Sequence, residues 1–481
     1  MKRTLTTTLL LSLALVSLAA KIPSAPNIVL ILSDDQGWGA TSVQMDKRIP
    51  DSASDFIRTP NLEKLAGRGV LFSQAYAPHP NCSPSRYSIQ TGKSPALLQM
   101  TDIVGRHTGN LYEGNRLTPP SHVNDIADEE VTIAEWIKQH RPEYSAAHFG
   151  KWHINGGGPK AHGYDASDGA TGNRDGLVLD GANPKRIFSI TESGNKWMEE
   201  QVKAKRPFFM QLSHYATHLA IFNLKSTLES CENREPGQRH NHAGHAAMSE
   251  DLDTGVGLTL AKIRELGIED NTYVIYLADN GSYPLPNPGN TNGPLHGWKA
   301  TLWEGGIRVP FIVAGPGIKP GRSRELVVGY DLFPTISEWL GIEKNPEGVE
   351  GGSLVKILSG DPHASIIRPN NFLVFHFPHY QLDKGSQPVT TLLQGNYKLI
   401  KFWETGDYRL YDLKKDLSES DDISKNQTNR TVKMSRLMND YLASINAGIP
   451  SVNTQFDPLT DPGRENLVTK HRLLEEPYFI Q

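Results

Sequence analysis

Residues 27–37 read NIVLILSDDQG, an apolar run that ends in a short polar turn carrying two adjacent acidic side chains, Asp34 and Asp35. Continuous apolar runs of this length, alternating with helix-like segments, are typical of a largely parallel sheet covered by helices on both faces. In such sheets, ligands bind outside the carboxyl ends of the strands. We therefore expect an α/β domain in which four polar turns meet at one edge, because three more runs have the same pattern: 145–149 before GKWH, 208–212 before SHYATH and 272–277 before ADNG.

The rest of the chain predicts further elements of this domain and a smaller second one. Helix-like segments and one more strand are expected in the first domain at 61–66, 131–139, 249–266 and 335–340 (helices) and at 311–314 (strand). A stretch rich in Gly and Pro follows at 345–369. Four alternating runs and a helix then predict a small α+β domain with an antiparallel sheet, at 372–377, 390–393, 397–402, 408–413 and 431–445. The expected divisions are an amino-terminal segment at 1–20, the large domain at 21–368, the small domain at 369–447 and an irregular tail at 448–481.

Composition and the amino terminus restrict the class of protein. The chain has 481 residues with 49 basic and 53 acidic side chains, a net charge of −4, which disfavours a nucleic-acid partner. Lys2 and Arg3 precede the apolar run 9–18 and a small-residue cleavage site, the pattern of a signal peptide. We expect an exported protein, periplasmic or secreted, without an integral membrane segment after cleavage, because no other stretch is long and apolar enough.

The two cysteines, Cys82 and Cys231, would form a disulfide in the simplest interpretation for an oxidising compartment. The segment around the first cysteine, NCSPSRYSIQTG at 81–92, indicates something more specific. It predicts a helix start with Ser83 as the cap, Pro84 at the first helical position and Gly92 as the stop. Cys82 would then lie at the positive end of the helix, where an anion is stabilised, and Arg86 would follow one turn later.

This segment resembles the signature of the formylglycine-dependent sulfatases of the alkaline phosphatase superfamily, Cys-x-Pro-x-Arg followed at a fixed distance by Thr-Gly. The resemblance covers most of the chain. Within the family, the chain resembles the bacterial polysaccharide sulfatases. It implies an alkaline-phosphatase-like large domain with a mostly parallel central sheet flanked by helices. Four other segments match the family in order: 27–39, 277–281, 295–310 and 410–413.

The resemblance implies that Cys82 is oxidised to formylglycine (3-oxoalanine) by a formylglycine-generating or anaerobic sulfatase-maturating enzyme. One hydroxyl of the aldehyde hydrate attacks sulfur and expels the alcohol, and loss of a proton from the other releases sulfate. The resemblance also implies one divalent cation, and oxygen ligands suit Ca²⁺ before Mg²⁺. Its ligands would be the modified Cys82 together with Asp34, Asp35, Asp279 and Asn280.

The same resemblance assigns roles to cationic side chains and histidines. Lys151 and Lys299 would contact the sulfate, and Arg86 would stabilise the hydrate. His153 would assist turnover of the hydrate. His218, with Lys299, would protonate the departing sugar oxygen, since a sugar alkoxide is a poor leaving group. At His218 the chain departs from the family, because the Pro expected after His-x is missing from THLA at 217–220.

Three further residues are expected to contact substrate: His296, Arg106 and His107. The last two lie in the long loop 93–115, which we expect to wall the site together with 155–176. The stretch RHNHAGH at 239–245 raises the alternative of a zinc site at His240, His242 and His245. A polar lead-in to the next helix is favoured, because no Cys or carboxylate stands at familiar zinc spacing.

The leading interpretation is a hydrolase of sulfate esters on a sulfated polysaccharide or oligosaccharide, with a galactose-type residue as the expected sugar. Two alternatives stay open. A phosphate or phosphonate ester hydrolase would use the same formylglycine. A non-catalytic glycan-binding relative would keep the fold and lose several site residues, and none is lost in this sequence.

Overall fold

The computed structural model describes residues 25–106, 114–178, 180–285, 291–381 and 384–457. Within these residues an eight-stranded mixed sheet forms the centre of the large part of the molecule. Its strands, in spatial order, are β10 (Gly321–Ser323), β2 (Gly69–Phe72), β9 (Phe311–Ala314), β8 (Thr272–Ala278), β1 (Asn27–Ser33), β7 (Phe208–Ser213), β5 (Ser145–Gly150) and β6 (Ala166–Ser167). The expected signal peptide at 1–20 lies outside the described residues.

The four strands that precede the polar turns lie side by side. β8, β1, β7 and β5 are consecutive in the sheet and parallel, so their carboxyl ends meet at one edge. All four are fully buried along their length, as expected for strands covered on both faces. This arrangement confirms the mostly parallel sheet predicted from the apolar runs. β9 runs antiparallel to β8 and to β2.

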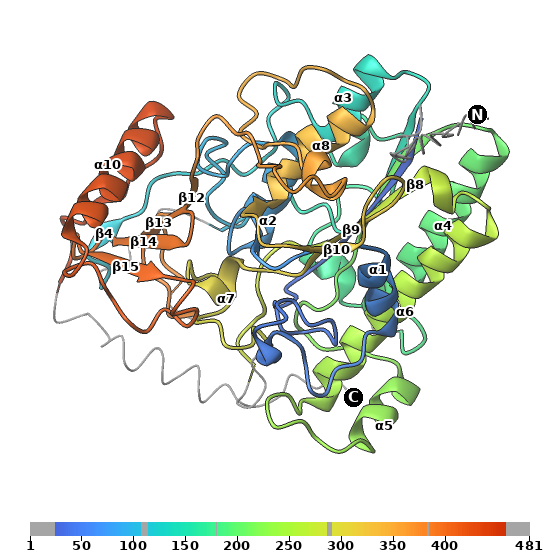
Figure 1. The fold of residues 1–481 in the computed structure, drawn as a ribbon, viewed down its shortest axis with the longest axis horizontal. Helices are drawn as coiled ribbons and strands as arrows, with labels where there is room; N and C mark the ends of the chain where they lie inside the picture. Colours follow the sequence, from blue (N-terminus) through green and yellow to red (C-terminus); the bar gives the residue numbers. More distant parts are fainter. Residues whose placement is uncertain (1–24, 107–113, 179, 286–290, 382–383, 458–481) are drawn as a thin grey trace, which may run out of the picture.

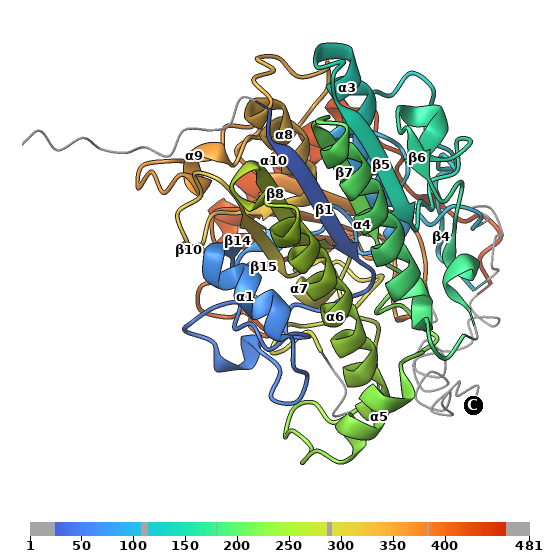
Figure 2. The same ribbon diagram turned by 90° about the vertical axis from the view of Figure 1, so that its right-hand side faces the viewer.

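Helices cover both faces of this sheet. One face is packed by α1 (Pro60–Arg68), α4 (Ile187–Lys203) and α6 (Ala243–Glu265), and Figure 2 shows α4 and α6 lying in front of the strands. The other face is packed by α2 (Cys82–Thr91), α3 (Ile133–His140) and α8 (Leu332–Trp339). Two large apolar clusters, one per face, therefore hold the sheet and fix the positions of its carboxyl ends.

The start of α2 differs from the sequence prediction. The helix begins at Cys82 and its N-cap is Asn81, which makes no side-chain cap hydrogen bond. Ser83 is not the cap, because its hydroxyl lies 3.4 Å from Nδ1 of His153 and accepts the N–H of Val104. Gly92 ends the helix in the left-handed conformation, φ 73°, as expected of a helix-terminating glycine. Cys82 therefore lies in the first turn of α2, where helix N–H groups carry partial positive charge.

A second, antiparallel sheet confirms the expected α+β part of the chain. Its order is β12 (Leu373–Phe377), β13 (Val389–Gln394), β14 (Tyr397–Phe402) and β15 (Tyr408–Asp412). α10 (Thr428–Ser444) covers one face of this sheet (Figure 1). The other face packs against buried side chains of the large part. The boundary expected at residue 368 stays a prediction, and so does the irregular tail, of which 451–452 pair with 117–118.

The remaining elements are short and connect these layers. They are β3 (Ala75–Tyr76), β4 (Leu117–Thr118), α5 (Lys225–Glu232), α7 (Glu304–Ile307), β11 (Val327–Val328), α9 (Val355–Leu358) and β16 (Ser451–Val452), with 3₁₀ turns at Pro50–Ser52, Pro159–His162, Asn173–Gly176, Pro184–Arg186, Glu269–Asn271 and Gly329–Asp331. None of the described helices has the length and apolar character needed to cross a membrane.

A buried ion network ties the second sheet to the large part of the molecule. Lys398 on β14 lies 3.0 Å from Glu304 and 2.7 Å from Glu419, and all three side chains are fully buried. Glu304 also accepts a hydrogen bond from Tyr76 at 2.8 Å and pairs with Arg308 at 3.2 Å. Removing one partner from such a network leaves uncompensated charge in the interior, which costs more than the pair itself contributes.

The Lys398→Met variant is therefore expected to lose about 3–5 kcal/mol of unfolding free energy, measured by urea denaturation near pH 8. Burial already raises the pKa of Glu419 to about 7. Lys398 and Arg308 hold the pKa of Glu304 below its usual value. Without the Lys398 ammonium, the pKa values of both Glu304 and Glu419 rise in the folded state, whereas those of the unfolded chain stay the same. The folded variant then binds more protons than its unfolded chain, so the loss shrinks as pH falls towards 5.

The matched control is Lys433→Met on the exposed side of α10, which is expected to change stability by less than about 0.5 kcal/mol. An equal, small effect of both substitutions would show that the network contributes nothing to folding.

Candidate functional site

The carboxyl edge of the parallel strands gathers side chains from five separate parts of the chain. Asp34 and Asp35 follow β1, Lys151 follows β5, and Asp279 with Asn280 follows β8. Cys82 and Arg86 come from the first turns of α2, and Lys299 comes from the loop before α7. Ligand atoms of the acidic residues and the sulfur lie within 4.8 Å of one another: Asp34, Asp35, Cys82 and Asp279.

Cys82 is the centre of this group. Its Sγ lies 3.3 Å from Oδ1 of Asp34, 3.8 Å from Oδ1 of Asp35 and 3.2 Å from Nζ of Lys299, and its side chain is fully buried. Burial, with the nearby charge of Asp34, raises the pKa of the thiol. A thiol held in its neutral form is a weak nucleophile.

The disulfide alternative is wrong in this structure. Both cysteines are free and buried, and Cys231 on α5 packs in a separate apolar cluster with Phe56, Ile57 and Ala247. The two sulfurs belong to different parts of the core, so Cys82 is available for other chemistry.

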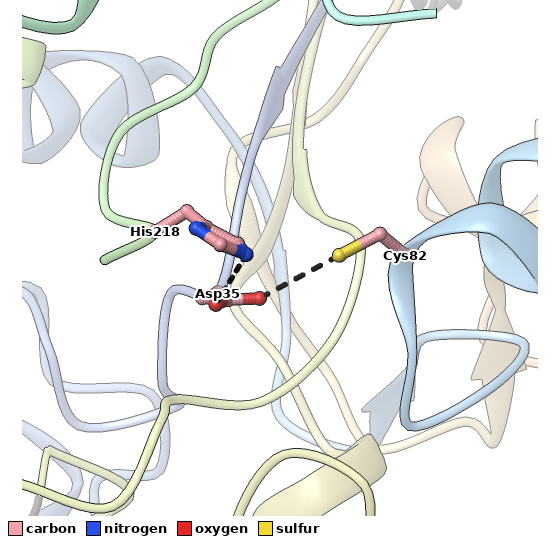
Figure 3. Close-up of side chains that lie close together, drawn as sticks. All are labelled: Asp35, Cys82 and His218. Atoms are coloured by element: carbon pink, nitrogen blue, oxygen red, sulfur yellow. Dashed lines mark hydrogen bonds and ion pairs between the residues drawn. The ribbon is translucent and has the colours of Figure 1, made fainter. Parts of the chain in front are cut away.

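Figure 3 shows how three of the side chains face one another: the carboxylate of Asp35 lies between the imidazole of His218 and the sulfur of Cys82. His218 comes from the loop after β7, and its Nε2 is 3.8 Å from Oδ2 of Asp35. Its side chain is 24% exposed, whereas that of Asp35 is fully buried. His218 therefore marks the side of the group that is open to solvent.

Each buried carboxylate has its own cation. Lys151 is 2.5 Å from Asp34, Lys299 is 2.6 Å from Asp35, and Arg86 is 2.8 Å from Asp279. These short charge-assisted contacts fix the side chains in place.

The pKa values reflect this balance of burial and charge. Burial alone would raise the pKa of Asp34, but the Coulombic attraction of Lys151 and other cations lowers it well below its usual value. Burial, together with the negative charge of Asp34, raises the pKa of Asp279 to about 6. The cations therefore keep Asp34 ionised, whereas the carboxyl group of Asp279 is easier to protonate than an exposed one.

Several features of this group fit a divalent cation. Asn280 donates from Nδ2 to Asp35 at 2.7 Å, which leaves its Oδ1 buried without a hydrogen-bond partner. A buried orphan carbonyl oxygen beside three carboxylates calls for a ligand. Carboxylate and amide oxygens are the donors that Ca²⁺ takes in proteins. The residues present therefore fit the predicted calcium site, with Asp34, Asp35, Asp279 and Asn280 as its protein oxygens.

Arg86 and His153 lie in the group with contacts that the sequence did not indicate. The guanidinium of Arg86 contacts Asp279 and donates to the carbonyl of Lys151 at 2.6 Å, instead of contacting Cys82. His153 adopts a left-handed φ of 59° and approaches Ser83. Burial and the charge of Lys151 lower its pKa well below the usual value, so this imidazole is neutral.

Two of the three residues expected to bind substrate, Arg106 and His296, make other contacts. Arg106 contacts Asp102 at 3.4 Å and the carbonyl of Tyr380. His296 stacks on Trp303, with ring centroids 4.1 Å apart. His107 lies outside the described residues. Neither Arg106 nor His296 contacts Cys82 or the carboxylates in the described part of the chain.

The histidine-rich stretch before α6 has structural contacts. His242 accepts the N–H of His245 and caps the helix, and His240 lies 2.8 Å from the hydroxyl of Ser54. These contacts agree with the polar lead-in that the spacing favoured over a zinc site.

Sequence reasoning did not identify two residues at the site. Gln381, after β12, accepts a hydrogen bond from Asn81, the residue before Cys82. Lys185, before α4, is acted on by the charges of Asp34 and Lys151. Gln381 follows an apolar strand, a signal that was available, whereas nothing in the residues around Lys185 marks it.

Comparison with known proteins identifies the family models and relatives that this chain matches. The Sulfatase family model matches residues 26–342, and the model described as N-sulphoglucosamine sulphohydrolase, C-terminal, matches residues 295–446. An N-acetylgalactosamine-6-sulfatase of Canis lupus familiaris is 31% identical over 368 residues, covering 69% of this chain and 66% of that protein, just under two-thirds of its length. A sulfatase of Formosa agariphila is 26% identical over 501 residues, covering 87% of this chain and 88% of that protein.

Solved structures agree in fold. The structure of BT4656 in complex with its substrate D-glucosamine-2-N,6-O-disulfate matches with a TM-score of 0.68 and 17% identity, over 88% of this chain and 98% of that one. This likeness confirms the predicted alkaline-phosphatase-like fold class. Because the Sulfatase model spans well over half of its length, the chain belongs to the sulfatase family.

Proposed function

We propose that this protein hydrolyses sulfate esters of a sulfated carbohydrate, using a formylglycine made from Cys82 and one Ca²⁺. The observation that carries the proposal is the setting of one buried sulfur, in the first turn of α2, among carboxylates and ammonium groups. A sulfate ester carries a permanent negative charge, and its hydrolysis needs fixed positive groups aimed at the sulfate oxygens and at the leaving oxygen.

The charge of the group supports binding of an anion once a metal is present. Three carboxylates are balanced by three cationic side chains, so the protein residues alone come close to neutrality. Adding a divalent cation makes the group positive by two charges, which attracts an anionic ester into a buried site. Without the metal, the ammonium groups of Lys151 and Lys299 are held by Asp34 and Asp35.

Bound Ca²⁺ would supply Lewis acidity that orients sulfate oxygens and lowers the pKa of a hydroxyl beside it. Asp34, Asp35, Asp279 and Asn280 would hold it. Lys299, at 3.2 Å from the sulfur of Cys82, is placed to contact both the modified side chain and the ester. His218, on the exposed side, is placed to exchange a proton with the departing oxygen.

Conversion of Cys82 to formylglycine is the chemical requirement of this proposal. The hydrate of the aldehyde supplies an oxygen nucleophile where the thiol is buried and neutral. The Cys-x-Pro-x-Arg signature at 82–86 is the segment that a formylglycine-generating or anaerobic sulfatase-maturating enzyme would act on. Arg86 keeps Asp279 and the Lys151 carbonyl in place around that position.

The substrate we propose is a sulfated polysaccharide, or an oligosaccharide derived from it, with a galactose-type sulfated residue. Support comes from the dog relative, which is named for N-acetylgalactosamine 6-sulfate. Export to the periplasm or the medium is proposed on the sequence pattern of the first twenty residues. A polymeric, highly charged substrate is met outside the cytosol.

The proposal is tested by parallel assays of the purified, matured protein with 4-nitrophenyl sulfate and 4-nitrophenyl phosphate, combined with mass spectrometry of the tryptic peptide that contains Cys82. We expect sulfate release to exceed phosphate release, and a peptide in which sulfur is replaced by oxygen at position 82. Preferential phosphate release would instead support the phosphate ester hydrolase. If the protein releases neither sulfate nor phosphate from these esters, the result would support the glycan-binding alternative.

A further inference from the structure

Lys185 is a buried lysine that has no counter-ion in the described part of the chain. It lies in the 3₁₀ turn Pro184–Arg186 that leads directly into α4, and its side chain is 1% exposed. In the described part of the chain its ammonium makes no hydrogen bond and has no carboxylate within 4.0 Å. Its neighbour is the ring of Phe222, whose centroid lies 5.3 Å from Nζ.

Three other buried lysines differ from Lys185 because each of them pairs with a carboxylate. Lys151, Lys299 and Lys398 are at most 4% exposed, and each has a carboxylate at 2.7 Å or closer. Burying an ammonium group without a counter-ion costs free energy, and a contact with one aromatic ring returns only part of it. Such a charge is expected where a ligand supplies the missing partner.

The backbone holds Lys185 in this position. Lys185 and Arg186 both adopt left-handed conformations, with φ of 54° and 55°, which non-glycine residues rarely take. The turn is fixed by an ion pair of Arg186 with Asp168 at 3.2 Å, and by Asn183, whose Oδ1 accepts the N–H groups of Phe188 and Ser189. Local strain maintained by surrounding contacts is common at binding sites.

The position of Lys185 relates it to the site already described. Phe222 belongs to the segment after β7 that also carries His218. Burial lowers the pKa of Lys185 to about 7, and the charges of Asp34 and Lys151 also act on it, although it contacts neither residue. Lys185 therefore lies near the carboxylates without pairing with them, and the ring that it contacts stands four residues after His218 in the same segment. The amino terminus of the 17-residue α4 adds partial positive charge at the same place.

We propose that Lys185 binds a second anionic group of the carbohydrate, a neighbouring sulfate or a carboxylate, while the first sulfate occupies the centre at Cys82. This proposal deepens the proposed function and rests on it. An anion beside Lys185 would supply the counter-charge that the protein leaves out, in a buried setting where such a pair is strong. It would favour substrates that carry two or more negative groups per short segment.

The first test measures whether the charge of Lys185 contributes to the stability of the folded protein. Lys185→Met keeps the length and apolar stem of the side chain and removes its charge. We expect an unchanged or raised Tm in the absence of ligand, because an unpaired buried charge is removed. A Tm lowered by several degrees, with the exposed Lys196→Met of α4 as the matched control, would show a structural role and overturn the proposal.

The second test measures binding in the Cys82→Ala background, which does not turn over. Calorimetric titrations compare a monosulfated disaccharide with a disulfated one and with a monosulfated disaccharide that contains a uronic acid. For Lys185→Met we expect Kd to rise at least about tenfold more for one of the dianionic ligands than for the monoanionic one. The ligand that loses affinity identifies the second group as sulfate or carboxylate. Equal changes for all three ligands, or no binding of any of them, would overturn the proposal.

Sulfate release by the matured protein separates this proposal from the function on which it rests. If the wild-type protein releases sulfate and Lys185→Met lowers kcat/KM equally for mono- and dianionic substrates, the role of Lys185 is wrong and the function stands. If the wild-type protein releases no sulfate from any substrate, the proposed function fails, whereas the titrations still decide whether Lys185 binds a second anion.

Discussion

The Cys82→Ala variant is expected to lose sulfate release from 4-nitrophenyl sulfate by at least about 10⁴-fold in kcat, in line with the removal of a covalent nucleophile in other hydrolases. Alanine cannot be converted to an aldehyde, so the site keeps its carboxylates and cations but has no reacting oxygen. The measurement is initial-rate release of nitrophenol by matured wild-type and variant proteins at equal concentration. Because Sγ of Cys82 accepts a contact from Lys299 and lies beside Asp34, a thermal melt of both proteins checks that the fold is retained.

Cys231→Ala is the matched control for this experiment. Cys231 is the other free, buried cysteine, and it packs in an apolar cluster with Phe56 and Ile57 that contains none of the residues around Cys82. We expect it to lose less than about 2 kcal/mol of stability and to retain sulfate release. Activity that survives in Cys82→Ala, or that disappears equally in Cys231→Ala, would contradict the assignment of Cys82 as the reacting position.

The Asp279→Asn variant is expected to lose calcium binding and at least about 100-fold in kcat/KM, since outer partners of a metal ligand alone are worth 10–100-fold. Asp279 is fully buried, pairs with Arg86 at 2.8 Å and accepts the N–H of Asp35 at 3.2 Å. The substitution keeps the shape of the side chain and removes the charge that a divalent cation needs.

Thermal melts provide a readout of the metal that does not depend on turnover. Calcium at one hundred times its Kd would stabilise the wild-type protein by about 2.7 kcal/mol, and a chelator would reverse the shift. We expect the shift to be absent in Asp279→Asn and intact in Asp270→Asn, an exposed position before β8. A chelated wild-type protein that keeps full activity and an unshifted Tm would contradict the calcium site.

The fold could be predicted in outline because its signals are local. The apolar runs that became β1, β5, β7 and β8 each show strand character within six or seven residues. Parallel strands place their carboxyl ends at one edge, so the grouping of their polar turns follows from the strand assignment itself. The helix that carries Cys82 was also recognisable, from Pro84 near its start and Gly92 at its end.

Other features escaped prediction because they depend on contacts between distant parts of the chain. His296 stacks on Trp303, a contact that the sequence did not indicate, and its expected contact with the sugar stays a prediction. Ser83 was expected to cap α2, but its hydroxyl meets His153, seventy residues away. For Ser83, a partner that is remote in sequence outweighs the local preference of the residue.

The sequence by itself determined the strand and helix order, the acidic turns and the helix start that carries Cys82, because each is encoded in a short run of residues. Only the tertiary structure decided which cation meets which carboxylate and that Cys231 lies apart from Cys82. It also decided that Lys185 is buried without a counter-ion among the described residues. The physical reason is that pairing and burial are properties of side chains brought together by the whole packed chain. No local pattern specifies the distance between residues that stand a hundred positions apart.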